Sequence, residues 1–207
     1  MAISPVEVIS IVKDFMLTIA AFIGMIVAIK GLGTWNRQLK GGAEYELARK
    51  ILRHTYRLRG TIKDLRNPMI VPSEQNFPDD ERRLSMEEKR FYGIHHAYQM
   101  RWEKVNTARD DLQAELLEAE VIWGKATYDY FDPLFKLQRE LFADVQSYLS
   151  SANPDAGEQE KEMWNRIRGS RREVLYDLAT SGDDEYSSEI TTAIVGIESY
   201  LKPHLAK

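Results

Sequence analysis

The sequence predicts an all-α protein, with one apolar helix near the N-terminus followed by an elongated helical bundle or coiled coil. Residues 15–29 contain no charged side chain. Through most of the remaining chain, apolar residues recur at alternating steps of three and four, as on one face of a helix. No stretch alternates between apolar and polar residues over the length of a strand. With 207 residues, the chain is long enough to bury a core of its own.

The composition excludes several kinds of chemistry. Because the chain has no cysteine, it forms no disulfide, thiolate nucleophile or cysteine-ligated zinc or iron–sulfur site. Its formal net charge of -4 makes the chain as a whole a poor partner for nucleic-acid phosphates. Residues 30–66 nevertheless hold ten Lys or Arg against three acidic residues. Nucleic acid is therefore not an expected partner, and the basic segment needs another explanation.

After a short N-terminal segment, residues 1–14, the apolar stretch predicts a single transmembrane helix over residues 15–35. As a helix it would be about 31 Å long, at roughly 1.5 Å per residue, which matches a hydrocarbon core of about 30 Å. Lys30 can extend its ammonium toward the lipid headgroups, and Trp35 and Arg37 complete the expected interfacial anchors.

A signal-peptide core and a buried core helix are the alternatives to a transmembrane helix. The acidic residues Glu7 and Asp14 before the stretch, and the lack of a small-residue cleavage pattern after it, argue against a signal peptide. The stretch is apolar on every face, which argues against a helix that buries only one side.

The charges on either side of the predicted span indicate its orientation. Lys13 alone precedes it, whereas several basic residues follow within about 20 positions: Lys30, Arg37, Lys40, Arg49 and Lys50. We therefore expect the protein in the inner (plasma) membrane, among membrane lipids, with its C-terminal part in the cytoplasm.

Small residues recur along one face of the predicted span. Ala20, Gly24 and Ala28 are spaced four residues apart, which would let two helix backbones approach closely. One interpretation is self-association in the membrane into a homo-oligomer. The other is that small residues are simply common in transmembrane helices.

Residues 36–42 contain glycines and are predicted to form a flexible joint. Beyond it, residues 43–207 are predicted to form an all-helical cytoplasmic domain. Its first helix is basic, covers residues 43–66 and carries one seam for burial: Ala48, Ile51, Thr55, Leu58, Ile62 and Leu65. Three prolines in residues 67–84 end this helix and favour a loop.

A long helix over residues 85–131 carries the most regular pattern in the chain. Ser85 and Glu88 form a capping-box pattern at its start. From Met86 to Tyr130 such a helix would be roughly 67 Å long at 1.5 Å per residue, a length typical of a coiled coil or an elongated bundle. Three shorter helices are predicted at 133–150, 158–180 and 185–202. The seam of the long helix includes Tyr98, Trp102, Val105, Leu112, Leu116 and Trp123.

Arg49, Arg53 and Arg57 form a basic ridge on the helix predicted over residues 43–66. One interpretation is contact with anionic lipid, which requires the joint to bend because the attraction fades beyond about 8 Å. A second is packing on the acidic part of the same chain or of a protein partner. A third is a solvated face that follows the positive-inside tendency.

Motifs for catalysis, cofactors and metals are missing from the sequence. The histidines lack the Glu-x-x-His and His-Glu-x-x-His spacings. The adjacent pair His95-His96 would point about 100° apart on a helix, which is poor geometry for one metal. Nucleophile-elbow, P-loop and dinucleotide-binding patterns are also absent. We therefore expect that the protein is not an enzyme and binds neither a cofactor nor a metal. We also expect the aromatic seam residues to form core rather than to line a ligand pocket.

Residues 34–68, TWNRQLKGGAEYELARKILRHTYRLRGTIKDLRNP, resemble the juxtamembrane segment of small bacterial single-pass inner-membrane proteins that have no assigned activity. The Trp-x-Arg-Gln-Leu-Lys-Gly opening carries the resemblance, which covers about a sixth of the chain. It implies a bacterial inner-membrane setting and supplies no catalytic residue.

Two functional hypotheses follow from the sequence. The first is a membrane-anchored, non-enzymatic helical scaffold or adaptor that self-associates or docks a cytoplasmic partner. The second is an oligomeric membrane effector whose spans form or gate a conductive pathway in defence or stress. An enzyme is the third possibility, and it lacks the titratable cluster of known spacing that an active site requires.

Overall fold

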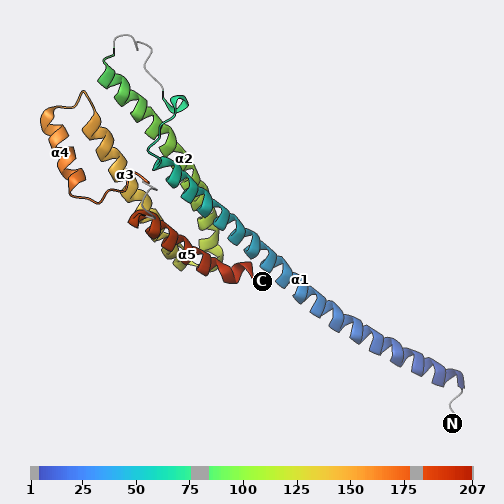
Figure 1. Cartoon of the computed structure of the whole chain (residues 1–207). Helices are drawn as coiled ribbons and strands as arrows, with labels where there is room; N and C mark the ends of the chain where they lie inside the picture. The colour runs from blue at the N-terminus through green and yellow to red at the C-terminus, as the bar shows by residue number, and fades with distance from the viewer. Residues whose placement is uncertain (1–4, 76–83, 178–183, 207) are drawn as a thin grey trace. The chain divides into compact units, whose positions relative to one another are not determined.

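The computed structural model describes residues 5–75, 84–177 and 184–206, and it is all-α in these ranges, as predicted. No strand occurs within them. Figure 1 shows the elements in chain order: α1 (Pro5–Leu65), the 3₁₀ helix η1 (Pro72–Glu74), α2 (Met86–Trp123), the 3₁₀ helix η3 (Lys125–Tyr130), α3 (Asp132–Ala152), α4 (Glu158–Gly169) and α5 (Glu185–Leu205).

The chain divides into two compact units, and α1 contributes to both. The N-terminal unit ends at Glu46, and the bundle unit consists of Leu47–Ala206. The predicted boundary, between residues 42 and 43, lies four residues before the observed one. Each unit has its own surface character and is described separately below.

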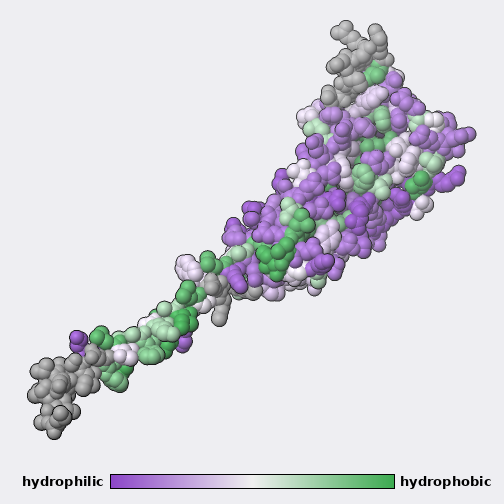
Figure 2. Space-filling model, turned by 180° about the vertical axis from the view of Figure 1, so that it is seen from behind, coloured by the Kyte–Doolittle hydropathy of each residue, from purple (hydrophilic) through white to green (hydrophobic). Residues whose placement is uncertain are grey.

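The N-terminal unit presents an apolar helix on all sides. Large hydrophobic side chains between Phe15 and Leu39 are 41% to 65% exposed, and the mean hydropathy of the most apolar 18-residue window is 2.2. Figure 2 shows hydrophobic residues along the described part of this unit, whereas the bundle unit is mostly hydrophilic on the face in view. Within the described ranges, one helix is thus long and apolar enough to cross a membrane.

The glycine joint predicted at residues 36–42 is helical throughout, because α1 continues through this segment to Leu65. The expected interruption is therefore not observed. Glycine in a helix interior costs about 1 kcal/mol relative to alanine, which weakens a helix without ending it. Residues 5–14, predicted to be a separate segment, are also part of α1, and residues 1–4 lie outside the described ranges.

The core of the bundle unit is one hydrophobic cluster from α1, α2, α3, α5 and the connection before α5. Every residue of the seam predicted on the basic helix is at most 1% exposed, so that prediction is confirmed. Helix α4 contributes no buried residue and packs on the outside of α3.

Helix α2 begins as predicted and ends earlier. The capping box is present, with the Glu88 N–H donating to Ser85 Oγ at 3.2 Å and the Ser85 N–H donating to Glu88 Oε2 at 2.7 Å. The helix stops at Trp123 rather than near residue 131, because Gly124 adopts φ 95° and ψ 169°, a conformation essentially restricted to glycine. Residues 125–130 form η3 instead.

Other predicted boundaries also need correction. The helix predicted at 158–180 ends at Gly169, and residues 170–177 form a non-helical strap; residues 178–180 lie outside the described ranges. Helix α5 was expected to stop before Pro203, but it runs to Leu205. A proline near the end of a helix removes only one late hydrogen bond. In the predicted loop at 67–84, the described residues 67–75 contain only η1, and residues 76–83 lie outside those ranges.

Candidate functional site

The small residues of the predicted span lie on one face of α1 in the N-terminal unit. Ala20, Gly24 and Ala28 are all exposed, and no atom lies within 4 Å of the position that a Cβ on Gly24 would take. Lys30 is exposed, and Trp35 is 62% exposed. Arg37 belongs to α1, but its side chain lies outside the described residues. This face is open for close contact with another helix.

The basic ridge of Arg49, Arg53 and Arg57 is partly used in contacts within the chain. Arg57 Nη1 donates to Asp111 Oδ2 of α2 at 2.6 Å, and Lys50 Nζ lies 3.6 Å from Glu115 Oε2 of the same helix. Arg49 and Arg53 are exposed. Packing on the acidic part of the same chain therefore explains Arg57, while the lipid-contact and solvated-face interpretations remain for Arg53.

The predicted seam of α2 lies mainly inside the bundle unit. Trp102 and Trp123 are partly buried and pack against the core, and Trp102 meets Phe142 of α3 at 4.8 Å between ring centroids. The other four predicted seam residues are at most 3% exposed: Tyr98, Val105, Leu112 and Leu116. These residues form the core of their own chain, so the seam is used in folding.

The two histidines of the adjacent pair make separate local contacts. His95 is exposed and lies 5.7 Å from Phe91 between ring centroids, whereas His96 is partly buried, with Nδ1 2.9 Å from the carbonyl oxygen of Glu74. No cluster of three or more potential ligating side chains occurs among the residues that the structure describes. The two imidazoles serve different local contacts.

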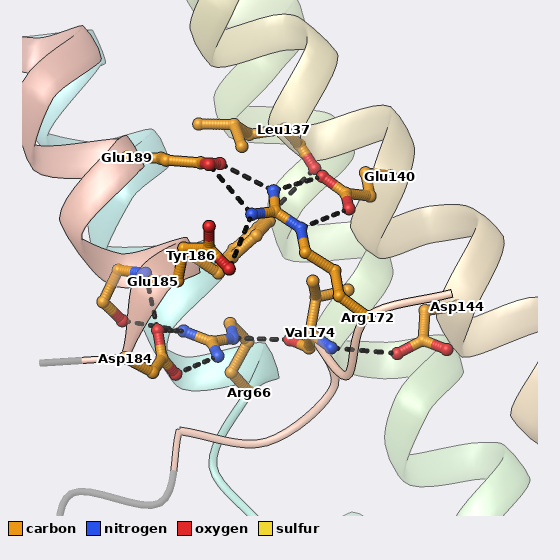
Figure 3. Close-up of polar contacts among 11 residues, drawn as sticks. Arg66, Leu137, Glu140, Asp144, Arg172, Val174, Asp184, Glu185, Tyr186 and Glu189 are labelled. Carbon is orange, nitrogen blue, oxygen red and sulfur yellow. Dashed lines mark hydrogen bonds and ion pairs between the residues drawn. The ribbon is translucent and has the colours of Figure 1, made fainter. Parts of the chain in front are cut away.

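Three arginines of the bundle unit were not predicted to have a role. Each joins separate segments of the chain through several hydrogen bonds of its guanidinium group, and we call each of them a clamp. The most buried is Arg66, which is 2% exposed and lies just after the last residue of α1. Its Nε donates to the Val174 carbonyl at 2.6 Å, and its Nη2 donates to the Tyr176 carbonyl at 3.0 Å. Its Nη1 and Nη2 also bind the Asp184 carboxylate at the N-terminus of α5, as Figure 3 shows.

Arg172 forms the second clamp. It belongs to the strap of residues 170–177, two carbonyls of which bind Arg66. It makes two hydrogen bonds of 2.7 and 2.8 Å to Glu140 of α3 and two of 2.9 and 2.6 Å to Glu189 of α5. The ring of Tyr186 lies beside both clamps, with its centroid 4.6 Å from the Arg66 guanidinium carbon and 5.8 Å from that of Arg172. Figure 3 shows how the strap ties α3 to α5 through these side chains.

Arg101 of α2 forms the third clamp, on the segment that follows α1. Its guanidinium donates at 2.6 Å to the carbonyls of Asn67 and Met69, and it makes two hydrogen bonds of 2.7 Å to the Glu74 carboxylate. The chain between α1 and η1 is thereby held against α2.

The ionisation of the clamp carboxylates follows from these contacts. Hydrogen bonds from Arg101 hold the pKa of Glu74 below its ordinary value, and hydrogen bonds from Arg172 do the same to the pKa of Glu189. Burial raises the pKa of Asp144 and raises that of Tyr176 to about 12. Glu74 and Glu189 are thus kept ionised as partners of arginine, which suits a structural role rather than acid–base catalysis.

Two cavities that open on the described surface of the bundle unit are larger than the pockets of about 220 and 290 Å³ found elsewhere on it. One, of about 550 Å³, lies between α1 and α5, and cationic side chains contribute to its lining. The other, of about 630 Å³, lies between α3 and α5, where apolar residues such as Pro133 and Leu137 share the lining with the charged side chains of Arg172, Glu140 and Glu189. The sequence identified neither cavity, because each forms between helices that are distant in the chain.

Comparison with known proteins identifies no relative. No family model matches the chain, and neither a curated protein nor a solved structure is similar to it.

Proposed function

We propose that this protein is a membrane-anchored, non-enzymatic helical scaffold or adaptor of the bacterial inner membrane. In this proposal α1 spans the bilayer through residues 15–35, and the bundle unit lies in the cytoplasm, where it can dock a protein partner. The excess of basic residues after the apolar segment supports this orientation. The resemblance of residues 34–68 to bacterial juxtamembrane segments supports the same setting.

Two helical faces could mediate self-association: the seam of α2 and the small-residue face of α1. The difference in their exposure supports association through α1. The α2 seam residues are buried in the core of their own chain. The face formed by Ala20, Gly24 and Ala28 is fully exposed in the N-terminal unit. Since membrane helices associate through small residues that allow close packing, we propose that copies of this protein associate through the span.

The effector hypothesis uses the same contact and adds conduction. Several spans that associate through Gly24 would line a pathway only if polar groups faced it. Residues 15–29 include one hydroxyl side chain, Thr18, and no charged one. The observations therefore favour the scaffold, and the effector hypothesis becomes an outcome of the test.

Replacing Gly24 with leucine tests the proposed association. We expect the detergent-solubilised full-length protein to be oligomeric and the Gly24→Leu variant to be monomeric, because a large side chain separates the backbones. Gly33→Leu is the matched control, since nine positions along a helix place it on the opposite side. No atom lies within 4 Å of an added Cβ at either glycine. Light scattering of the protein–detergent complex gives the mass.

Two outcomes would count against this proposal. An oligomer that persists in Gly24→Leu, and in a fragment of residues 43–207, would place association in the bundle unit. Dye entry and ion leakage on overexpression that disappear in Gly24→Leu would favour the effector hypothesis instead of the scaffold.

A further inference from the structure

We propose that the cavity between α1 and α5 binds a small molecule that carries a phosphate group. The cavity lies wholly within the bundle unit and has a volume of about 550 Å³. This volume falls inside the range of about 300–1,000 Å³ that is typical of small-molecule sites. The site is independent of self-association through the span.

The charge of the lining favours an anion. Arg59 and Lys63 lie one helical turn apart on α1, and both line the cavity. Among the described residues, neither forms an ion pair with a carboxylate; Arg59 instead lies over the Tyr56 ring, 4.9 Å from its centroid. Asp177 is the one carboxylate among the described lining residues. Two cations outside ion pairs that share one cavity are a site for charge-assisted hydrogen bonds to phosphate oxygens.

The rest of the lining suits a ligand with both a polar and an apolar part. Ser187 and Thr191, in the first turns of α5, place hydroxyl oxygens in the lining, at the end of the helix where the dipole favours negative charge. Ser187 Oγ accepts from Arg66 Nη1 at 2.8 Å and keeps its own proton to donate, whereas Thr191 Oγ1 donates to the Ser187 carbonyl at 2.9 Å. Ile62 and Ile190, which are 1% and 6% exposed, supply an apolar surface. A phosphate would therefore lie toward the cations and hydroxyls, and the remainder of the molecule would lie on the isoleucines.

Gly60 contributes no side chain to the cavity. It lies within α1 between Arg59 and Lys63 and lines the same cavity. Glycine is a poor helix former, and here no neighbouring atom within 4 Å of an added Cβ requires it. The absence of a side chain at this position leaves that part of the lining open.

Calorimetric titration of the full-length protein in neutral detergent tests the proposal. The probes are ATP and inorganic pyrophosphate for a free phosphate compound, and glycerophosphoglycerol for the headgroup of an anionic lipid. We expect saturable binding of at least one probe. Each of Arg59→Gln and Lys63→Gln should weaken this binding about tenfold, the factor expected when one charge-assisted hydrogen bond is lost.

Three further variants distinguish a defined site from general attraction. Gly60→Leu should abolish binding by filling the cavity, and leucine is the better helix former, so helicity by circular dichroism should be retained. Asp177→Asn should tighten binding several-fold by removing the opposing charge. Arg53→Gln is the matched control: it removes an exposed arginine of α1 outside the lining and should leave affinity within about twofold.

The outcome also identifies the source of the phosphate. Binding of ATP or pyrophosphate supports a free phosphate compound, and binding of glycerophosphoglycerol alone supports a lipid headgroup. Failure of all three probes to bind would overturn the proposal, as would an equal loss of affinity in Arg53→Gln. Neither result bears on the Gly24→Leu test, which measures mass.

Discussion

Arg66 contributes to the bundle unit through the number of its partners rather than through charge alone. Its guanidinium hydrogen bonds reach two backbone carbonyls, the Asp184 carboxylate and the Ser187 hydroxyl. A buried ion is tolerated only when such contacts replace the water that it loses. Its backbone carbonyl also accepts the Asp177 N–H at 3.0 Å, so the residue fixes the strap from two directions.

Replacing Arg66 with methionine should destabilise the bundle unit by at least about 2 kcal/mol, because two backbone carbonyls lose a donor at about 1–3 kcal/mol each. The two carbonyls and Asp184 would then lose their donor. Urea unfolding of the full-length protein, followed by circular dichroism, measures the change. Arg57→Met is the matched control, because the side chains of the Arg57–Asp111 pair are 55% and 38% exposed and such pairs contribute at most about 1 kcal/mol. Equal losses in the two variants would contradict the role assigned to Arg66.

The sequence predicts the apolar contacts of the core better than its polar ones. Ile51, Leu58 and Leu112 are buried as their spacing predicts, because a helical period is a property of neighbouring residues. Arg66 and Arg101 could not be identified in this way. An arginine that enters the core has the same local pattern as one on a solvated face, and the Arg66 partners lie 108 to 121 positions further along the chain.

At the scale of elements, the boundaries differ most from prediction where an apolar pattern continues past the end of a helix. The seam spacing of α2 continues through Ala126 to Tyr130, and both of these residues are exposed. Similarly, Val174 and Leu175 fit the pattern of the predicted helix 158–180, but they are buried from a non-helical strap. Helical spacing beyond the end of a helix is therefore a weak predictor: Ala126 and Tyr130 have it and are exposed, whereas Val174 and Leu175 are buried without being helical.

Gly124 ends α2, and its replacement with alanine should destabilise the bundle unit by about 1–3 kcal/mol, because its backbone conformation is essentially restricted to glycine. Gly196→Ala is the matched control: this glycine lies inside α5, with no atom within 4 Å of an added Cβ. The control should be neutral or stabilising by up to about 1 kcal/mol. Thermal or urea unfolding of both variants gives the comparison. A neutral Gly124→Ala would mean that the α2–η3 junction adopts another conformation.

At the scale of the whole molecule, the chain combines a unit that is apolar on its surface with a unit that is apolar inside. The sequence predicts both, since fifteen consecutive residues without charge and a patterned helix differ plainly in composition. It does not predict the cavity between α1 and α5, which exists only because helices from opposite ends of the bundle unit pack together.

The proposed orientation in the membrane can be tested with a single thiol, because the chain has no cysteine of its own. Val121 of α2 is 86% exposed, so Val121→Cys should react readily. We expect a membrane-impermeant maleimide to label it in inverted inner-membrane vesicles and not in intact spheroplasts. Ala2→Cys, on the other side of the predicted span, should show the reverse. Labelling of Val121→Cys in spheroplasts would place the bundle unit outside the cytoplasm.

The Arg66 clamp also affects how the chain is made. Its partners are synthesised 108 to 121 residues after it, which takes between about 5 and 25 seconds at the usual rates of translation. During that interval Arg66 has no partner from the strap or from α5. The apolar side of α1 is also not yet covered by the helices synthesised last. Closure of the bundle unit is therefore a late event in synthesis. A ribosome that stops before residue 184 leaves a chain in which Arg66 lacks the carboxylate of Asp184 and the hydroxyl of Ser187.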